Sequence, residues 1–290
     1  MVTPENIEKV DEYYEKNPGT TLCRAPQELQ IPQESLRKIF KTRIKSYPYK
    51  IQVLQRLSDY DEERRVEFPE NMMKKIQSGD ITADNIWFSD EAHFWLSGYV
   101  NKQNCRFWAK SNPRKYVETT LKPQRVTVWC AMCTNGIVGP YFFDGNVNGD
   151  SYETMLREYF IPFCKDKKVL DGYWYMQDGA LPHRTADVMD FLHDNFPGRV
   201  IGLGYNKRYG SGMDWPPYSP DLNPCDFYLW GRLKDVVYTT GPKNLDELKK
   251  RIKEEVEKIP KTEPAEAIRA FRNRCLAVIE NDGGHIEQFL

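Results

Sequence analysis

The spacing of apolar positions predicts three short helices in the N-terminal part of the chain. The first should begin at Pro4, with Thr3 as its N-cap, and end at the Asn17-Pro18-Gly19 tract. The second is expected around Pro26 to Leu29, and the third from Pro32 onward. The positions that should face a shared core are Ile7, Val10, Tyr14, Leu36, Ile39 and Phe40. This pattern is typical of a small all-α unit.

A break and a longer helix follow this unit. The tract Ser46-Tyr47-Pro48-Tyr49 stops the helical pattern, because proline disfavours a helical conformation in the residue before it. Residues 57–77 then resume an amphipathic helix that is rich in charge. We therefore divide the chain into a unit at 1–57, a linker helix at 58–83 and a larger domain at 84–290.

The larger domain mixes strand and helix patterns. Runs of β-branched and aromatic residues predict strands at 85–89, 105–108, 125–131, 137–143, 173–177 and 199–201. Helices are expected at 151–163 and 182–196, after the Asn223-Pro224 turn, and at 245–259 and 263–280. The order predicts an α/β fold with a mixed sheet flanked by helices. The sequence contains no glycine-rich phosphate loop and no internal repeat.

Three aspartates occupy suggestive positions in this domain. Asp90 and Asp178 each follow a predicted strand, and Asp226 lies just inside the helix after the proline turn. Adjacent strands lie about 4.8 Å apart, so carboxylates at their ends can converge. Three converging carboxylates suit Mg²⁺, and two such ions about 3.5–4 Å apart can support phosphoryl transfer. Each aspartate taken singly is equally compatible with a turn or a helix cap.

Composition narrows the class of protein. The net charge is −1 over 290 residues, so no global charge bias favours nucleic acid or membrane. No apolar run approaches the roughly 20 residues of a membrane helix. The polar start MVTPENIEKV is not typical of a secretory signal. The seven cysteines form no zinc set, and Cys130 and Cys133 should point to opposite faces of one strand. We interpret them as buried thiols of a reducing compartment.

Local charge is uneven at the third predicted helix. Between residues 37 and 56 the basic residues are Arg37, Lys38, Lys41, Arg43, Lys45, Lys50 and Arg56, and no acid interrupts them. Such a block favours contacts with phosphate, although a solvated helix face would look the same. With the preceding helices it predicts a helix-turn-helix unit whose third helix enters a major groove. The residues expected at the DNA are Ser35, Arg37, Lys38, Lys41, Arg43 and Lys45.

Several motifs resemble the mariner superfamily of cut-and-paste DNA transposases. They are FSDEAHF, NKQNCRFWA, RVTVWCAM, GPYFFD, QDGALPHRTA and WPPYSPDLNPCDFYLWGRLKDVVY, in the family's order over most of residues 84–240. The resemblance implies an RNase H-like catalytic domain with a DDE/D triad. By position, the triad is Asp90, Asp178 and Asp226. Asp221, in the Ser-Pro-Asp-Leu turn, matches the family's turn and not its metal ligand.

The resemblance also implies a chemistry and its partners. Two Mg²⁺ or Mn²⁺ ions held by the triad would support hydrolysis of a phosphodiester at the element's end. The freed 3′-hydroxyl would then attack target DNA. The partners implied are double-stranded DNA, as terminal inverted repeats and target, and a second copy of the chain in a homodimer. The protein would act in the nucleus, with no membrane involved.

The sequence departs from the family's pattern in three places. Only the second of the family's two helix-turn-helix units is recognisable, so end recognition is expected to be weaker. Pro26 lies in the second helix, and Gln30 stands where relatives have glycine at the turn. In addition, 48 positions separate Asp178 from Asp226, more than is usual, and the extra residues fall in a loop at 201–215. That loop either contacts DNA beside the site or is a disordered spacer.

Two neighbours of the triad and two rival functions stay open. His183 lies either near the scissile phosphate or in the packing of a helix start. Glu91 should point to the strand face opposite Asp90. One rival function is a catalytically silent or host-adapted relic that binds DNA. The other is an RNase H-like nuclease acting on RNA–DNA hybrids, against which the helix-turn-helix pattern and the Trp215–Trp230 tract count.

Overall fold

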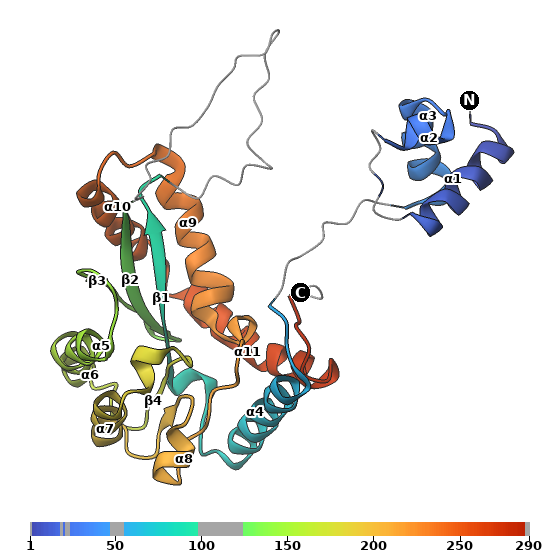
Figure 1. Ribbon diagram of the computed structural model, residues 1–290. Coiled ribbons are helices and arrows are strands. Elements are labelled where there is room, and N and C mark those ends of the chain that lie inside the picture. The colour runs from blue at the N-terminus through green and yellow to red at the C-terminus, as the bar shows by residue number, and fades with distance from the viewer. Residues whose placement is uncertain (1, 18–19, 21–23, 47–54, 98–123, 288–290) are drawn as a thin grey trace. The chain divides into compact units, whose positions relative to one another are not determined.

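The computed structural model describes residues 2–17, 20, 24–46, 55–97 and 124–287. The chain divides into two compact units, Met1–Val53 and Leu54–Leu290. The ribbon of each unit is drawn in Figure 1. Among the described residues, no helix is both long enough and apolar enough to cross a bilayer.

The smaller unit consists of three helices, as the apolar spacing predicts. They are α1 (Pro4–Lys16), α2 (Ala25–Leu29) and α3 (Gln33–Ile39), and α3 continues into a π-helical turn, η1 (Phe40–Ile44). The Thr3 hydroxyl accepts a hydrogen bond from the Asn6 backbone N–H, which caps α1. Gln30 ends α2 in the left-handed region (φ 58°), where glycine is usual. The core of the unit is Val10, Ala25, Leu29, Ile31, Leu36 and Ile39.

The larger unit is built on a five-stranded mixed sheet in the order β3-β2-β1-β4-β5. The antiparallel half runs from β1 to β3, and β4 and β5 pair parallel to β1. The strands are β1 (Ile86–Trp95), β2 (Arg125–Cys133), β3 (Gly136–Phe143), β4 (Trp174–Met176) and β5 (Val200–Ile201).

Helices cover both faces of this sheet (Figure 1). A continuous helical stretch made of α5 (Gly149–Met155), η3 (Leu156–Phe160) and α6 (Ile161–Lys167) lies on one side with α7 (Ala186–Asn195). The other side carries α9 (Gly231–Val237), α10 (Leu245–Glu257) and α11 (Thr262–Glu280). The shorter helical segments are η2 (Ala83–Asn85), η4 (Leu181–Arg184), α8 (Tyr205–Tyr209), η5 (Pro220–Leu222), η6 (Cys225–Trp230) and η7 (Tyr238–Thr240).

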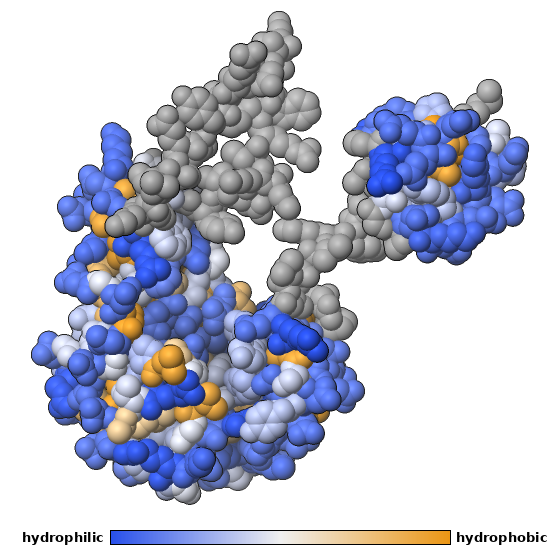
Figure 2. Space-filling view, in the orientation of Figure 1, coloured by the Kyte–Doolittle hydropathy of each residue, from blue (hydrophilic) through white to orange (hydrophobic). Residues whose placement is uncertain are grey.

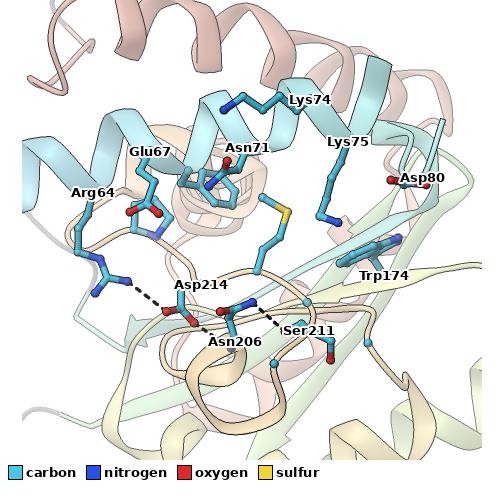
Figure 3. A pocket seen from close by; sticks show the side chains of 16 residues that line it. Arg64, Glu67, Asn71, Lys74, Lys75, Asp80, Trp174, Asn206, Ser211 and Asp214 are labelled. Carbon is cyan, nitrogen blue, oxygen red and sulfur yellow. Dashed lines mark hydrogen bonds and ion pairs between the residues drawn. The ribbon is translucent and has the colours of Figure 1, made fainter. Parts of the chain in front are cut away.

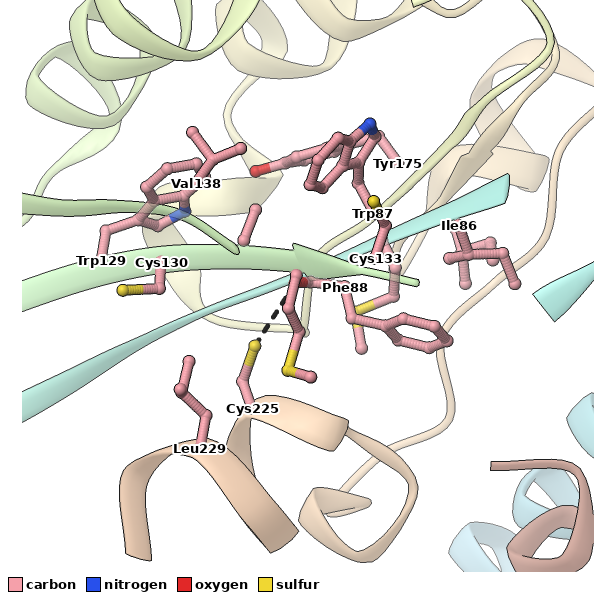
Figure 4. Close-up of a cluster of buried hydrophobic side chains, with 14 of the residues drawn as sticks. Ile86, Trp87, Phe88, Trp129, Cys130, Cys133, Val138, Tyr175, Cys225 and Leu229 are labelled. Atoms are coloured by element: carbon pink, nitrogen blue, oxygen red, sulfur yellow. Dashed lines mark hydrogen bonds between the residues drawn. The ribbon is translucent and has the colours of Figure 1, made fainter. Parts of the chain in front are cut away.

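Side chains alternate between the two faces of the central strands. Figure 4 shows Trp87, Trp129 and Tyr175 on one face of the sheet, with Cys225 and Leu229 of η6 packed below the other. The three aromatic side chains are at most 2% exposed, so they belong to the core. The Cys225 thiol donates to the Phe88 carbonyl of β1 (3.3 Å), which ties η6 to the central strand.

The helix α4 (Asp59–Ser78), predicted as a linker, is packed into the larger unit. Its Phe68 and Met72 side chains are buried in the main core, and Phe68 meets the Trp215 ring edge-to-face at 5.1 Å. Ser58 caps its N-terminus in a capping box with Asp61. The helix α4 also contacts α11, so the first and the last helix of the larger unit pack together.

One strand prediction is wrong in a way that matters for the site. Asp90 was expected where a strand ends, but β1 continues through it to Trp95. The reason is pairing: β2 matches β1 in register from Phe88 to Trp95, and Asp90 lies opposite Cys130. Asp90 therefore lies inside β1, with strand residues both before and after it. The strand predicted at 105–108 lies outside the described residues.

The surface seen in Figure 2 is largely hydrophilic, and the described cysteines are buried thiols, as the sequence predicts for them. On the face seen in Figure 2 hydrophilic residues predominate, with scattered apolar patches. The described cysteines are free and buried: Cys130, Cys133, Cys164, Cys225 and Cys275. Burial raises the pKa of these thiols, to about 11 for Cys133, so they stay protonated and act as small apolar side chains.

Candidate active site

Asp90 lies in the middle of β1 and faces η6. The Trp230 indole N–H donates to its Oδ2 at 2.7 Å, and only 9% of the residue is exposed. Burial raises the pKa of Asp90 well above its ordinary value, and the charges of Asp226, Glu91 and Asp178 raise it further. An acid in this position is destabilised as an anion unless a cation joins it.

Asp178 follows β4 by two residues and is fixed by its own turn. Its Oδ1 accepts the Ala180 backbone N–H at 2.9 Å and lies 2.6 Å from His183 Nδ1. Partial burial acts to raise the pKa of Asp178, but the hydrogen bond and charge of His183 outweigh it, and the pKa is lowered. The side chain is 42% exposed, so this carboxylate opens toward solvent.

Asp226 occupies the first turn of η6. Its backbone N–H donates to the Asn223 carbonyl at 2.9 Å, which starts the helical segment directly after the proline turn. Crowding by protein atoms raises the pKa of Asp226 to about 6, and the charge of Asp178 acts in the same direction. Hydrogen bonding with Asp90 and Asn223 and the charge of Lys234 oppose that shift. Asp226 is exposed to solvent.

The three aspartates come from β1, the end of β4 and η6, and each alters the ionisation of another. Asp90 responds to Asp178 and Asp226, and Asp226 responds to Asp178. The three carboxylates form an all-oxygen donor set that fits Mg²⁺ or Mn²⁺, and in Asp90 and Asp226 the anion is disfavoured until a cation joins it. Asp90, Asp178 and Asp226 are therefore candidate ligands of a shared cation.

His183 links this site to the opposite face of β1. It is 2% exposed; its Nε2 lies 3.3 Å from Glu91 Oε2, and its ring lies 4.2 Å from that of Tyr152. Burial acts to lower the pKa of His183, but the carboxylates of Glu91 and Asp178 outweigh it and raise the pKa to about 10. Glu91 therefore points away from Asp90, as predicted, and a protonated His183 bridges it to Asp178.

A different acidic cluster has another explanation. Among the described residues, Asp221, His285 and Glu287 are the group whose possible ligand atoms all lie within 4.8 Å of one another. However, both Asp221 oxygens accept hydrogen bonds from the Arg65 guanidinium, at 2.9 and 2.6 Å. Arg65 would repel a metal cation bound there. We therefore interpret the cluster as the buried Arg65–Asp221 ion pair, with His285 and Glu287 beside it, and not as a metal site.

The basic residues predicted to contact DNA lie on α3 and η1 and at the end of η1. Arg37, Lys38, Lys41 and Arg43 are exposed, as is Lys45 at the left-handed end of η1, and Ser35 is half-buried. The Arg37 guanidinium pairs with Glu34 on the same helix at 3.0 Å. This arrangement leaves a cationic helix face available to phosphates, and a role in DNA binding stays a prediction.

The segment at 201–215 is folded. It contains α8, and Met213 pairs with Ile201 as a short extension of the sheet. The Asp214 carboxylate accepts the backbone N–H groups of Gly204 and Asn206, at 3.1 and 3.0 Å. The alternative of a disordered spacer, left open by the sequence, is therefore wrong.

This segment and α4 enclose a cavity of about 640 Å³, whose described lining includes none of the three aspartates. Figure 3 shows Arg64 of α4 reaching across it to Asp214 (3.3 Å), with Lys75 above Trp174. The cavity is thus a junction between α4 and the 201–215 segment, apart from the acid site.

Comparison with models of protein families identifies the class of protein. Residues 85–249 match the model of the family described as "DDE superfamily endonuclease", which is more than half of the chain. The chain therefore belongs to the DDE superfamily of endonucleases. The matched range includes all three aspartates.

Individual relatives agree with that membership. The chain is 27% identical over 229 residues to the transposable element Tc3 transposase of Caenorhabditis elegans, covering 77% of this chain and 62% of the relative. It is 26% identical over 210 residues to the Tc1 transposase of the same organism, covering 69% of each. The chain thus spans less than two thirds of the length of the Tc3 relative.

Solved structures confirm the RNase H-like fold class. A Mos1 transposase paired-end complex with the left transposon end aligns with a TM-score of 0.74 at 16% identity, covering 98% of this chain and 81% of that one. The catalytic domain of Mos1 mariner transposase aligns with a TM-score of 0.61 at 16% identity, covering 81% of this chain and 100% of that one. The resemblance to mariner transposases inferred from the motifs is therefore confirmed.

Sequence reasoning missed the groups that hold the acids in place. Trp230, which donates to Asp90, was noticed only as part of an aromatic tract. Arg65, which binds Asp221, looked like one of many charges on an amphipathic helix. The signal for Trp230 was available, because it lies one helical turn after Asp226 and an indole N–H buried there needs an acceptor.

Proposed function

We propose that this protein is a metal-dependent DNA transposase of the mariner type, with Asp90, Asp178 and Asp226 as its catalytic triad. The observation that carries the proposal is the mutual influence of three carboxylates brought from β1, the end of β4 and η6. Membership of the DDE superfamily and similarity to the Tc3 and Tc1 transposases support it.

Each aspartate has a distinct role in this proposal. Asp90, which accepts a hydrogen bond from Trp230, is the shared ligand, and Asp178 and Asp226 complete the ligand set. When bound, divalent ions activate water and stabilise the leaving oxygen. His183 acts as a positioning residue, since it holds Asp178 and is itself held by Glu91. The titles of solved Mos1 mariner complexes name Mg and Mn, which supports the choice of ion.

The reaction proposed needs no covalent protein–DNA bond. Water attacks a phosphodiester at the element's end, the P–O3′ bond breaks, and a 3′-hydroxyl is released. That hydroxyl then attacks a target phosphodiester, whose own 3′-oxygen leaves as the new bond forms. Both steps exchange one P–O bond for another, so no oxidant, nucleotide or other co-reactant is required.

DNA is the proposed partner of both units. In the smaller unit the exposed cations of α3 and η1 would contact phosphates of the terminal inverted repeat. The solved relatives include a Mos1 paired-end complex with a transposon end, and by analogy we propose that two copies of this chain bind paired ends. A nuclear location follows from the substrate.

The test is nicking of a supercoiled plasmid that carries candidate element ends, with Mg²⁺ or Mn²⁺. The wild type should nick at the ends, and Asp226→Asn should reduce the rate by more than about 100-fold, because the effect of a lost ligand exceeds the 10–100-fold typical of residues behind the ligands. Asp235→Asn, an acid on the next helix, is the matched control and should cleave normally. Wild-type protein that binds DNA but cleaves with neither metal would instead identify a catalytically silent relic.

A further inference from the structure

Arg65 is a fully buried cation in the first half of α4. Its side chain is 0% exposed, and its guanidinium makes a bidentate pair with Asp221. The same group donates to the Ser219 hydroxyl at 2.7 Å and to the Tyr218 carbonyl at 3.1 Å. Arg65 therefore binds three residues of the turn that precedes η6, namely Tyr218, Ser219 and Asp221. Binding all three needs the planar guanidinium of arginine, which presents several N–H donors at once.

Arg65 also holds the C-terminal turn against α4. Its Nε donates to the Gly283 carbonyl at 2.6 Å, and an Nη donates to the Gly284 carbonyl at 3.3 Å. Gly283 has φ +84°, and a Cβ there would lie 2.2 Å from the Glu62 carbonyl oxygen of α4. This close approach leaves no room for α4 to shift without disturbing Arg65 and its partners.

The anchored turn leads directly to Asp226. Asn223 accepts the backbone N–H of Asp226, and its side-chain amide donates to the Ser89 carbonyl at 3.4 Å, next to Asp90. The Asn223 side-chain oxygen also accepts the Cys225 N–H at 3.1 Å. The short segment between Asp221 and Asp226 is therefore fixed at one end by Arg65 and at the other by β1.

We propose that Arg65 is a positioning residue for the acid site: by anchoring Asp221 it sets where the Asp226 carboxylate lies relative to Asp90. The inference rests on the proposed function, because the position of Asp226 matters only if it is a metal ligand. Arg65 touches no reacting atom, and its effect passes through the turn.

The experiment measures Mn²⁺ binding by electron paramagnetic resonance, using the full chain, together with amide exchange in the metal-free protein. Arg65→Lys keeps the charge but loses the fork, so it should weaken Mn²⁺ binding about tenfold, as residues behind a ligand do. It should also speed exchange of the Asp226 and Phe227 amides, which both donate to Asn223. The matched control is Met72→Ala, a buried apolar change on the same helix, which should alter neither readout by more than about twofold.

The outcomes separate this inference from the proposed function. Arg65→Lys behaving like Met72→Ala, while Asp226→Asn abolishes Mn²⁺ binding, would overturn the inference and leave the function standing. Wild type without Asp226-dependent Mn²⁺ binding would overturn both. Should Arg65→Lys not fold, Ser219→Ala removes one acceptor of Arg65 together with the hydroxyl's own hydrogen bond to the Pro217 carbonyl, and a loss of about threefold in Mn²⁺ affinity with faster exchange at Asp226 is expected. An unchanged Ser219→Ala variant would then count against the inference.

Discussion

Two aspartates on either side of the same turn lie in opposite environments. Asp221 is 1% exposed, and each of its carboxylate oxygens accepts a hydrogen bond from the Arg65 guanidinium. Crowding by protein atoms and the charge of Asp178 raise the pKa of Asp226 to about 6. The protein compensates Asp221 with Arg65 and Asp178 with His183, whereas among the described residues none forms an ion pair with Asp90 or Asp226. The difference teaches that two acids of the candidate site, Asp90 and Asp226, carry charge that a bound cation would compensate, while the charge of Asp221 is already used to support the turn.

The largest effect is expected at the uncompensated acids. Asp90→Asn should lower metal-dependent nicking by more than about 100-fold, since it removes the ligand that both other acids face. The variant keeps an oxygen that can accept the Trp230 N–H, so the fold should survive. Plasmid nicking and circular dichroism measure the two effects. An Asp90→Asn protein that still cleaves at the wild-type rate would remove Asp90 from the triad.

A large effect of a different kind is expected at the compensated acid. Asp221→Asn leaves a buried guanidinium without its countercharge, which costs about 3–5 kcal/mol of unfolding free energy. Urea denaturation followed by tryptophan fluorescence measures it. The seven tryptophans all lie at or after residue 87, so the signal reports the larger unit. A cost under about 1 kcal/mol, as for an exposed pair, would contradict the assignment of Asp221 as a buried anchor.

An intermediate effect is expected at the histidine beside the site. His183→Asn removes the group that bridges Asp178 to Glu91, and nicking should fall about 10–100-fold, as for residues that orient metal ligands. Glu91→Gln is a milder variant, and its nicking rate is compared with that of His183→Asn. It keeps a polar contact to His183 and leaves the contact with Asp178, so its loss should be smaller. Equal losses in the two variants would mean that Glu91 acts directly and not through His183.

The smallest effect is expected at the second cation near the turn. Arg274 donates to the Asp221 backbone carbonyl at 2.9 Å and lies 3.7 Å from the Phe227 ring centre, but it does not pair with the carboxylate. Arg274→Met should therefore cost only about 1 kcal/mol, far less than Asp221→Asn. The same denaturation assay tests it. A cost as large as that of Asp221→Asn would show that backbone contacts, and not the ion pair, hold the turn.

The order of elements could be predicted because each leaves a local signal. The helices α1, α10 and α11 follow apolar spacing, caps and proline positions, and the strands follow β-branched and aromatic runs. The motifs predict three acids for the site, and the structure brings them from β1, the end of β4 and η6. Their assignment as catalytic ligands stays a proposal.

Long-range pairing could not be predicted in the same way. The extension of β1 beyond Asp90 depends on β2, which follows after more than 25 further residues, so a local pattern suggested a strand end. Arg65 and Asp221 are 156 positions apart, and nothing near Arg65 distinguishes it from the solvated charges of α4. The folded state of the 201–215 segment depends on Asp214 closing on Gly204 and Asn206, a contact that composition does not reveal.

The most direct test applies one substitution to both sides of the turn. Unfolding free energies of Asp226→Asn and Asp221→Asn are measured by urea denaturation in the absence of divalent metal. Asp226→Asn should raise the stability, by up to about 1 kcal/mol for a partly solvated charge, because it relieves repulsion from Asp90 and Asp178. Asp221→Asn should lower it by several kcal/mol. If both variants are destabilised alike, Asp226 has a compensating partner in the protein, and the proposed metal site loses its physical basis.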